Sequence, residues 1–578
     1  MAQRAATIAC LALTIAAASA AQSPPPEFLR GVAALHSFEY EEANEAFLNV
    51  QKTEPGFAMA YWGEAMTYHQ ALWRNENIAS ARQALARLGA TPAARAAKAK
   101  TPKDKALLEA VDILFGAGDS ATRRSAYAEA MGALHAREKG NPDVASFYAL
   151  ALLGTMSRSL IGYVDAHEGH SMSLAGSDTQ TRVADILGNV LVSHPEHPGA
   201  LHYLLHNYDD PEHARLALSA ARTYAKVAPE SSHALHMPAH IFVQLGMWAD
   251  AATSDRAAFA ASDAWVKAKG LSPAMRSYHA LSWLQYELLQ LGRYREASET
   301  AAELAPLVKA SGDLALLSDL SSMRARFAIE TRRWDLMAQE RNFGNINELC
   351  AIGFSAARSG NGSLAELARH ALATRAQSAE EGDLRPAAAI MERQVAAVIE
   401  LAAGRSERAV EILKAATEAE LKLPPPLGLP EPIKPAPELL GEVLLELGRP
   451  GEALEPFRRA LARNANRTLS VLGLARASAA LGEGDASREH YRDLLAIYAS
   501  ADADLPELNE ARAAIARNGG SSPSLWPARA LPIAAAVGVL IGVAFLLRRR
   551  TARTPGTAAS RPNISRAGRR RRDRRSGK

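Results

Sequence analysis

The chain has 578 residues, of which 48% are hydrophobic and only 6% aromatic. That length excludes a single compact core and predicts several domains or a repeat array, and the many Ala, Leu, Glu and Arg residues favour helices over strands. The net charge of +4 hides an asymmetry, because residues 548–578 hold twelve Arg and one Lys against one Asp, which leaves −8 for the rest. A mildly acidic body argues against nucleic-acid binding as its function.

The N-terminus has the pattern of an export signal. Arg4 precedes the apolar run Ala5–Ala18, and small residues continue to Ala21. Residues 1–21 are therefore predicted to be a signal peptide, and an uncleaved anchor is the alternative. Cleavage removes Cys10 and leaves Cys350 alone, so we expect no disulfide, no cysteine-based zinc site and no haem-attachment motif.

From Phe28 onward the apolar pattern predicts consecutive pairs of helices. The segment Leu447–Phe457 recurs further along the chain as Leu481–Tyr491, with Gly and Ala at matching positions. Glycine permits a left-handed turn between two helices, and the small alanine lets the helices approach closely. Further copies of the Gly–Ala pattern begin at Leu245, Leu291 and Ala403.

The offset between these two segments matches the repeat length of the tetratricopeptide repeat (TPR) family, which is about 34 residues. Together with the spacing of Tyr40, Ala43, Phe47 and Pro55, this period resembles that family. The resemblance covers most of residues 28–500. It implies an all-α, TPR-like helical-pair solenoid whose concave groove binds a protein or peptide. We expect three helical stretches: an N-terminal array over residues 22–310, irregular pairs over 311–422 and C-terminal pairs over 438–517.

Histidine is concentrated in one part of the N-terminal array. Eight of the sixteen histidines lie within His194–His240. The pair His202 and His206 recurs one TPR-like period later as His236 and His240. On the helix predicted from Pro198, the histidines form a stripe about 100° away from the apolar stripe. They are therefore not expected to belong to the core of their own helix pair.

In the TPR family the equivalent stripe lines the ligand-binding groove, so the resemblance implies a histidine-lined groove. Neighbouring helices pack about 8–10 Å apart, so two i,i+4 pairs can converge on one divalent ion. Zinc and copper both suit imidazole, and Met172 and Met237 lie near the histidines; iron is the third option. The predicted metal ligands are His202, His206, His236, His240, Asp209 and Asp210. The other predicted groove residues are His233, His279, His167, His170 and Glu168, with His36 and His69 on the same stripe further upstream.

Two other interpretations of these histidines stay open. The imidazoles can simply hydrogen-bond within the fold, or they can form a pH-sensitive peptide groove. The segments His197–Pro211, His233–Phe242 and Ile433–Leu439 also resemble a group of bacterial TPR-domain proteins with the same histidine spacing. That resemblance supports the fold and the site, and it implies no reaction.

The remaining elements follow the helical array. Residues 423–437 contain seven prolines and cannot be helical, so this segment is either a plain connector or an insertion across the concave surface. Residues 518–529 form a predicted linker, and the uncharged residues 530–547 form a predicted transmembrane helix. The basic residues 548–578 are expected to stay in the cytoplasm on anionic lipid, in preference to binding nucleic acid. This topology predicts a bacterial inner-membrane protein with its array in the periplasm or outside the cell.

The sequence has no phosphate-binding loop, dinucleotide fingerprint or nucleophile elbow, so we expect no nucleotide cofactor. His167-Glu168-Gly169-His170 falls one residue short of the zincin motif. The leading hypothesis is a membrane-anchored extracytoplasmic scaffold with a His/Asp metal site in its groove. The alternative is a metal-dependent hydrolase or oxidoreductase that uses the same site. A scaffold with purely structural histidines is the third hypothesis.

Overall fold

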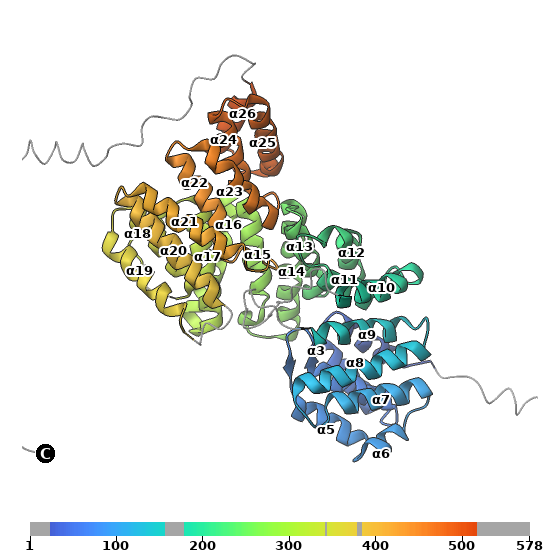
Figure 1. Ribbon diagram of the computed structural model, residues 1–578. Helices are drawn as coiled ribbons and strands as arrows, with labels where there is room; N and C mark the ends of the chain where they lie inside the picture. Colours follow the sequence, from blue (N-terminus) through green and yellow to red (C-terminus); the bar gives the residue numbers. More distant parts are fainter. Residues whose placement is uncertain (1–22, 157–177, 342–343, 379–383, 517–578) are drawn as a thin grey trace, which may run out of the picture. The chain divides into compact units, whose positions relative to one another are not determined.

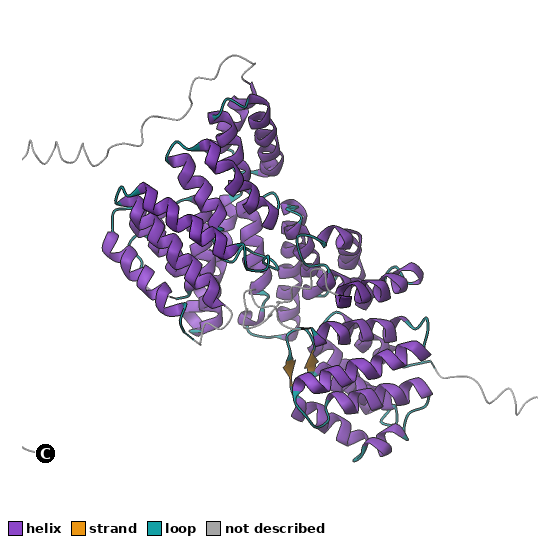
Figure 2. Ribbon diagram, viewed as in Figure 1, coloured by secondary structure: helices purple, strands orange, loops and turns teal. Residues whose placement is uncertain are grey.

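The computed structural model describes residues 23–156, 178–341, 344–378 and 384–516. The chain divides into two compact units, residues 1–521 and 522–578, and every described residue belongs to the first. Within the described residues the fold is almost entirely helical, and consecutive helices pack against each other (Figures 1 and 2). The strands of this part are β1 (His69–Gln70) and β2 (Asn75–Glu76), which pair antiparallel.

The helices fall into three stretches of the sequence. The first comprises α2 (Pro26–His36), α3 (Tyr40–Thr53), α4 (Ala58–Thr67), α5 (Ile78–Leu88), α6 (Pro92–Ala96), α7 (Pro102–Leu114), α8 (Ser120–Arg137) and α9 (Pro142–Thr155). The second comprises α10 (Asp178–Ser193), α11 (Pro198–Asn207), α12 (Ala214–Val227), α13 (Ser232–Gln244), α14 (Trp248–Lys269), η1 (Pro273–Met275), α15 (Tyr278–Gln290), α16 (Tyr294–Ser311), α17 (Leu314–Thr331) and η2 (Trp334–Leu336). The third comprises α18 (Ile346–Arg358), α19 (Gly362–Arg375), α20 (Arg385–Ala402), α21 (Ser406–Glu420), α22 (Ala436–Glu446), α23 (Pro450–Arg463), α24 (Thr468–Ala480), α25 (Gly484–Ile497), η4 (Tyr498–Ser500) and α26 (Pro506–Ala516).

The repeated glycines and aromatics explain why the helices pair. Gly448 and Gly482 end α22 and α24 with positive φ angles of 71° and 77°, which glycine adopts without strain. The ring of Phe457 on α23 is fully buried, and a Cβ added at Gly441 of α22 or Gly473 of α24 would overlap it. A large ring on the middle helix thus fits only because both flanking helices present glycine. The predicted helical-pair fold is confirmed.

The first helices of the array pack around a buried phenylalanine in the same way as the last ones. Phe47 of α3 is fully buried between α2 and α4, where a Cβ at Gly31 or Gly63 would overlap its ring. Burial of one such side chain stabilises the fold by about 1.5–3 kcal/mol. One apolar cluster then extends from Phe28 to Met323, as expected for repeats that cannot bury their apolar faces alone.

The proline-rich segment, residues 423–437, packs into the array and is not a plain connector. Its first residues are held by Arg463 of α23, which donates to the carbonyls of Leu423 and Pro424 at 3.0 and 2.8 Å. Further along, Gln244 of α13 donates to Pro426 O at 3.0 Å. The segment therefore connects α21 to α22 by way of α13, the helix that carries His236 and His240.

Several predicted elements lie outside the described residues. These are the signal peptide (1–21), the linker (518–529), the transmembrane helix (530–547) and the basic tail (548–578). Within the part that the structure describes, no helix is both long and apolar enough to cross a membrane.

Candidate metal centre

Three imidazoles from α13 and α15 meet at their Nε2 atoms. His236 and His240 lie one turn apart on α13, and their Nε2 atoms are 3.0 Å apart. His279, the second residue of α15, brings its Nε2 to 3.1 Å from that of His236. We call these residues the α13–α15 triad. Their ligand atoms all lie within 4.8 Å of one another.

Two carboxylates hold the outer nitrogens of this triad. Asp255 of α14 accepts from His236 Nδ1 at 2.5 Å, and Asp209, just after α11, accepts from His240 Nδ1 at 2.7 Å. A carboxylate only accepts, so both imidazoles carry their proton on Nδ1. A neutral imidazole with its proton on Nδ1 presents a lone pair at Nε2. Two such lone pairs at 3.0 Å repel each other unless a shared proton or a metal ion lies between them.

A second set of three imidazoles lies one repeat earlier. His202 and His206 of α11 have their Nε2 atoms 3.1 Å apart, and His233 of α13 brings its Nε2 to 3.0 Å from that of His202. We call these residues the α11–α13 triad. The Nδ1 of His202 faces the backbone carbonyl of His36 at 2.7 Å, so this ring too carries its proton on Nδ1.

Both triads follow one rule of the repeat. The fifth and ninth residues of one helix supply the i,i+4 pair, and the second residue of the next equivalent helix supplies the third imidazole. The rule stops at α15, where the fifth and ninth residues are Ser282 and Tyr286. The rule also does not apply one repeat earlier, because the second residue of α11 is Gly199 and not a histidine. A Cβ at Gly199 would overlap the ring of His36.

Burial favours the neutral form of four of these imidazoles. It lowers the pKa of His202 to about 3, although the contact with the His36 carbonyl opposes the shift. Burial, followed by the neighbouring imidazoles, lowers the pKa values of His206, His233 and His236 well below the ordinary 6.5. Neutral imidazole is the form that binds a metal ion. The protonation state at neutral pH therefore suits metal binding.

The spacing of the nitrogens also fits an ion. Zinc binds imidazole nitrogen at about 2.0–2.1 Å, so two ligands of a tetrahedral ion lie about 3.3 Å apart. In each triad, two of the Nε2 separations, at 3.0 and 3.1 Å, are close to that value. In the α13–α15 triad, the carboxylates behind His236 and His240 also match the outer-shell pattern in which an acceptor fixes the tautomer of a ligand.

An aromatic ring lies against each triad. Trp283 of α15 has its ring centroid 4.4 Å from that of His240, and a Cβ at Gly428 of the proline-rich segment would overlap the indole. Phe38, in the turn between α2 and α3, has its centroid 4.4 Å from that of His202. Phe38 adopts a φ of 59°, a conformation that is strained for a bulky residue. These rings keep the triads in apolar surroundings.

A third His/Asp group is a hydrogen-bonding network. His36 and His197 both place Nε2 near Asp143 Oδ1, at 3.0 and 3.2 Å. The Nδ1 of His36 meets the hydroxyl of Tyr203 at 3.0 Å, and the Nδ1 of His197 accepts from the backbone of Ala200 at 3.1 Å. Each ring nitrogen of this group has a protein partner, so the group ties α2, α9 and α11 together without an ion.

The structure groups the predicted site residues differently from the sequence prediction. The four paired histidines do not meet at one point, because each i,i+4 pair joins a histidine of the following helix. Asp209 accepts from His240 Nδ1, on the side of that ring opposite the triad. Asp210 instead accepts from the backbone and the ring of His213 at the start of α12.

The remaining predicted residues lie in different parts of the fold. His202, His236 and His240 are buried and do not line an open groove, because aromatic rings and neighbouring helices cover them. His233 and His279, predicted only as groove residues, complete the triads. His69 lies on β1, 3.6 Å from Glu76. The predicted residues His167, Glu168, His170 and Met172 lie outside the described part of the chain.

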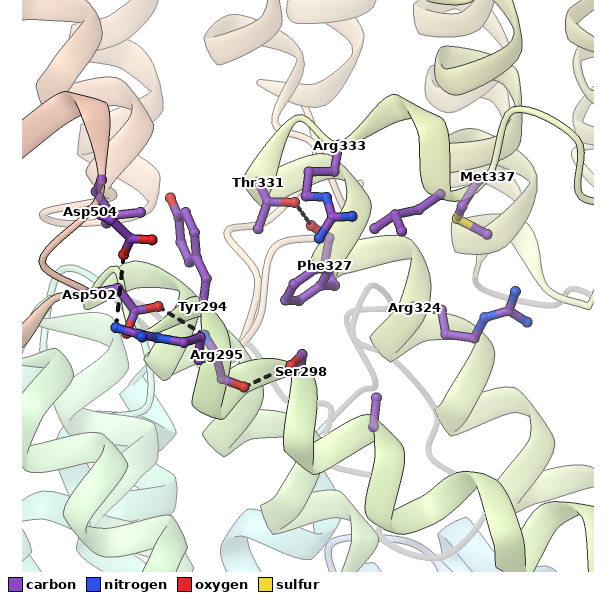
Figure 3. Close-up of a pocket in the computed structure, with 13 residues that line it drawn as sticks. Tyr294, Arg295, Ser298, Arg324, Phe327, Thr331, Arg333, Met337, Asp502 and Asp504 are labelled. Atoms are coloured by element: carbon purple, nitrogen blue, oxygen red, sulfur yellow. Dashed lines mark hydrogen bonds and ion pairs between the residues drawn. The ribbon is translucent and has the colours of Figure 1, made fainter.

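A separate cavity of about 540 Å³ lies between α16, α17, η2 and the loop before α26. Its charged side chains pair among themselves or with neighbours: Arg295 contacts Asp502 and Asp504 at 3.3 and 3.8 Å (Figure 3), and Arg324 binds Glu340 at 2.9 Å. The lining contains no histidine, and the cavity belongs to neither triad.

Comparison with known proteins finds solved structures of low similarity. No protein-family model matches the sequence, and no curated protein matches it. Similar solved structures include a tetratricopeptide repeat protein from Parabacteroides merdae, with 13% identity over 50% of this chain and 98% of that chain and a TM-score of 0.28. Yeast Tom70 is 12% identical over 83% of this chain and 86% of its own, with a TM-score of 0.28. The Cut9–Hcn1 hetero-tetramer of APC/C is 11% identical over 72% and 83%, with a TM-score of 0.31.

The fold is TPR-like. Its helix pairs, their glycine turns and their period show this architecture. Identities of 11–13% transfer no partner or activity from these proteins. The likeness to the histidine-rich bacterial group stays a prediction.

Proposed function

We propose that this protein is a TPR-like scaffold that binds a divalent metal ion through His236, His240 and His279. One observation carries the proposal: the Nε2 lone pairs of His236 and His240 face each other at 3.0 Å, while Asp255 and Asp209 hold the opposite nitrogens. A cation between the rings converts this repulsion into attraction. Zinc and copper fit a set of neutral imidazoles best.

The array is proposed to serve as a docking platform for a protein or peptide, as expected for a fold of stacked helix pairs. In this proposal the N-terminal signal and the span over residues 530–547 place the array outside the cytoplasm, anchored in a bacterial inner membrane. The basic tail then contacts anionic lipid on the cytoplasmic side. A reporter fused after residue 578 should be active only in the cytoplasm, and periplasmic activity would overturn the topology.

Metal analysis of the purified full-length protein tests the site. Wild type, stripped with chelator and reloaded with Zn²⁺, should retain zinc through gel filtration. His236→Ala with His240→Ala should lose at least one equivalent. The exposed His194, which lies outside both triads, provides the control His194→Ala, and this variant should keep the wild-type content. A wild-type chain that retains no zinc, copper or iron would overturn the proposal.

A metal-dependent enzyme is the second candidate, because three protein ligands are the number found in catalytic zinc sites. A divalent ion held by three imidazoles acts as a Lewis acid when a further position accepts water or substrate. Substitution with Co²⁺ reports on that position. Azide that shifts the visible cobalt spectrum supports an exchangeable site and the enzymatic function. A spectrum unchanged by azide argues for a structural ion.

A further inference from the structure

The α11–α13 triad repeats the geometry of the proposed site with a different set of residues. Its Nε2 separations of 3.0 and 3.1 Å equal those of the α13–α15 triad. It contains His202, which is fully buried, and His233, which is 8% exposed. The same helix positions supply the ligands, so the repeat duplicates the arrangement together with the fold.

The positions of the protons on these rings also point to an ion at this second site. His202 carries its proton on Nδ1, because that atom faces the carbonyl of His36 at 2.7 Å. Its Nε2 therefore offers a single lone pair, and two other Nε2 atoms approach that lone pair, from His206 and His233. One lone pair accepts one N–H well and not two. An ion that accepts a lone pair from each ring satisfies all three at once.

The two triads share helix α13. His233 and His236 lie at i and i+3 on it, which makes them neighbours on the helix surface. His233 joins the earlier triad and His236 the later one. The two metal positions are thus adjacent along the stack, with no helix between α13 and either of them.

We propose that His202, His206 and His233 bind a second divalent ion of the same class, so that α13 supplies ligands to both ions of a two-metal centre. This inference rests on the proposed function, because it presupposes that the α13–α15 triad binds metal. It adds a second site, a stoichiometry of two and a close spacing of the ions.

The wild-type stoichiometry is the first test and needs no variant. Full-length apo-protein titrated with Zn²⁺ should bind two equivalents, and the same protein loaded with two Cu²⁺ should show an electron paramagnetic resonance spectrum broadened by the neighbouring spin. His202→Gln with His206→Gln should reduce the stoichiometry to one and sharpen the copper spectrum. His236→Gln with His279→Gln should do the same. His194→Gln is the control and should still bind two.

The outcomes separate this inference from the proposed function. A wild-type stoichiometry of one that is lost in the α13–α15 variant and kept in the α11–α13 variant overturns the second ion and leaves the proposed function intact. A stoichiometry of two, with a copper spectrum equal to the sum of the two single-site spectra, overturns the two-metal centre. A wild-type chain that binds no metal overturns both.

Discussion

Replacement of Asp255 by Asn tests the role of the carboxylate behind His236. Asp255 is fully buried on α14, and its Oδ1 lies 2.5 Å from His236 Nδ1. Asparagine keeps the shape and an accepting oxygen but removes the negative charge that favours a bound cation. Loss of such an outer-shell partner typically weakens metal affinity ten- to hundredfold. That corresponds to about 1.4–2.7 kcal/mol of binding free energy.

Competition between the full-length protein and a chromophoric zinc chelator measures this loss. Asp263→Asn is the matched control, because Asp263 lies on the same helix, is partly exposed and pairs with Arg276 and Lys267 at 2.9 and 2.5 Å. The control should bind zinc within twofold of wild type. Equal affinities for Asp255→Asn and wild type, or equal losses in both variants, would refute the role assigned to Asp255.

Three further predictions concern the surroundings of the site and the stability of the array. Gly428→Ala should push against Trp283, lower the unfolding free energy by about 1–3 kcal/mol and change the tryptophan emission. In the control Gly451→Ala, the nearest neighbour of the new methyl group lies 3.9 Å away, so stability should not fall. Equal melting curves for the two variants would contradict this prediction. Arg467 pairs with the buried carboxylates of Glu330 and Glu438 at 2.6 and 2.9 Å, and Arg467→Ala removes this partner. Urea denaturation should then show that the unfolding free energy falls by about 3–5 kcal/mol. A fall of less than about 1 kcal/mol would refute the role of the pairing. Burial raises the pKa of Glu431 to about 8, so the folded chain keeps a proton that the unfolded chain loses above the ordinary value of 4.5. The unfolding free energy should therefore fall as pH rises from about 4.5 to about 8, and Glu431→Gln should reduce this fall. Urea midpoints that change in parallel for both proteins between pH 5 and pH 8 would contradict this.

The helical pairs were predictable because their signals are local. Gly448 and Gly482 mark equivalent turns of successive repeats, and the aromatic residues Phe47 and Phe457 recur at fixed offsets from small residues. Each signal acts within one or two helices, and the packing confirms it. The course of the proline-rich segment was only half predictable. Its composition excludes a helix, but its contact with Gln244 joins residues 182 positions apart.

The candidate site was predictable in part for the same reason. The i,i+4 pairs are a property of single helices, so His202, His206, His236 and His240 stand out in the sequence. The third ligands do not, because His233 follows His202 by 31 residues while His279 follows His236 by 43. The 22-residue helix α14 breaks the period and hides the equivalence.

The partners behind and beside the ligands carry no sequence signal. Asp255 reaches His236 from the middle of α14, and Phe38 reaches His202 from a turn near the start of the array, far away in the sequence. These contacts depend on how helices stack. The histidines group in two threes because consecutive equivalent helices are offset, so that the second residue of one helix lies beside the fifth and ninth residues of the previous one.

X-ray absorption spectroscopy of the zinc-loaded full-length protein tests the central claim most directly. The α13–α15 triad predicts a first shell with three imidazole nitrogens at about 2.0–2.1 Å and the outer-shell scattering typical of histidine rings. The His236→Ala, His240→Ala double variant should lose that signal from its site. Zinc coordinated only by oxygen, or a loaded protein whose spectrum is unchanged in the double variant, would contradict the account.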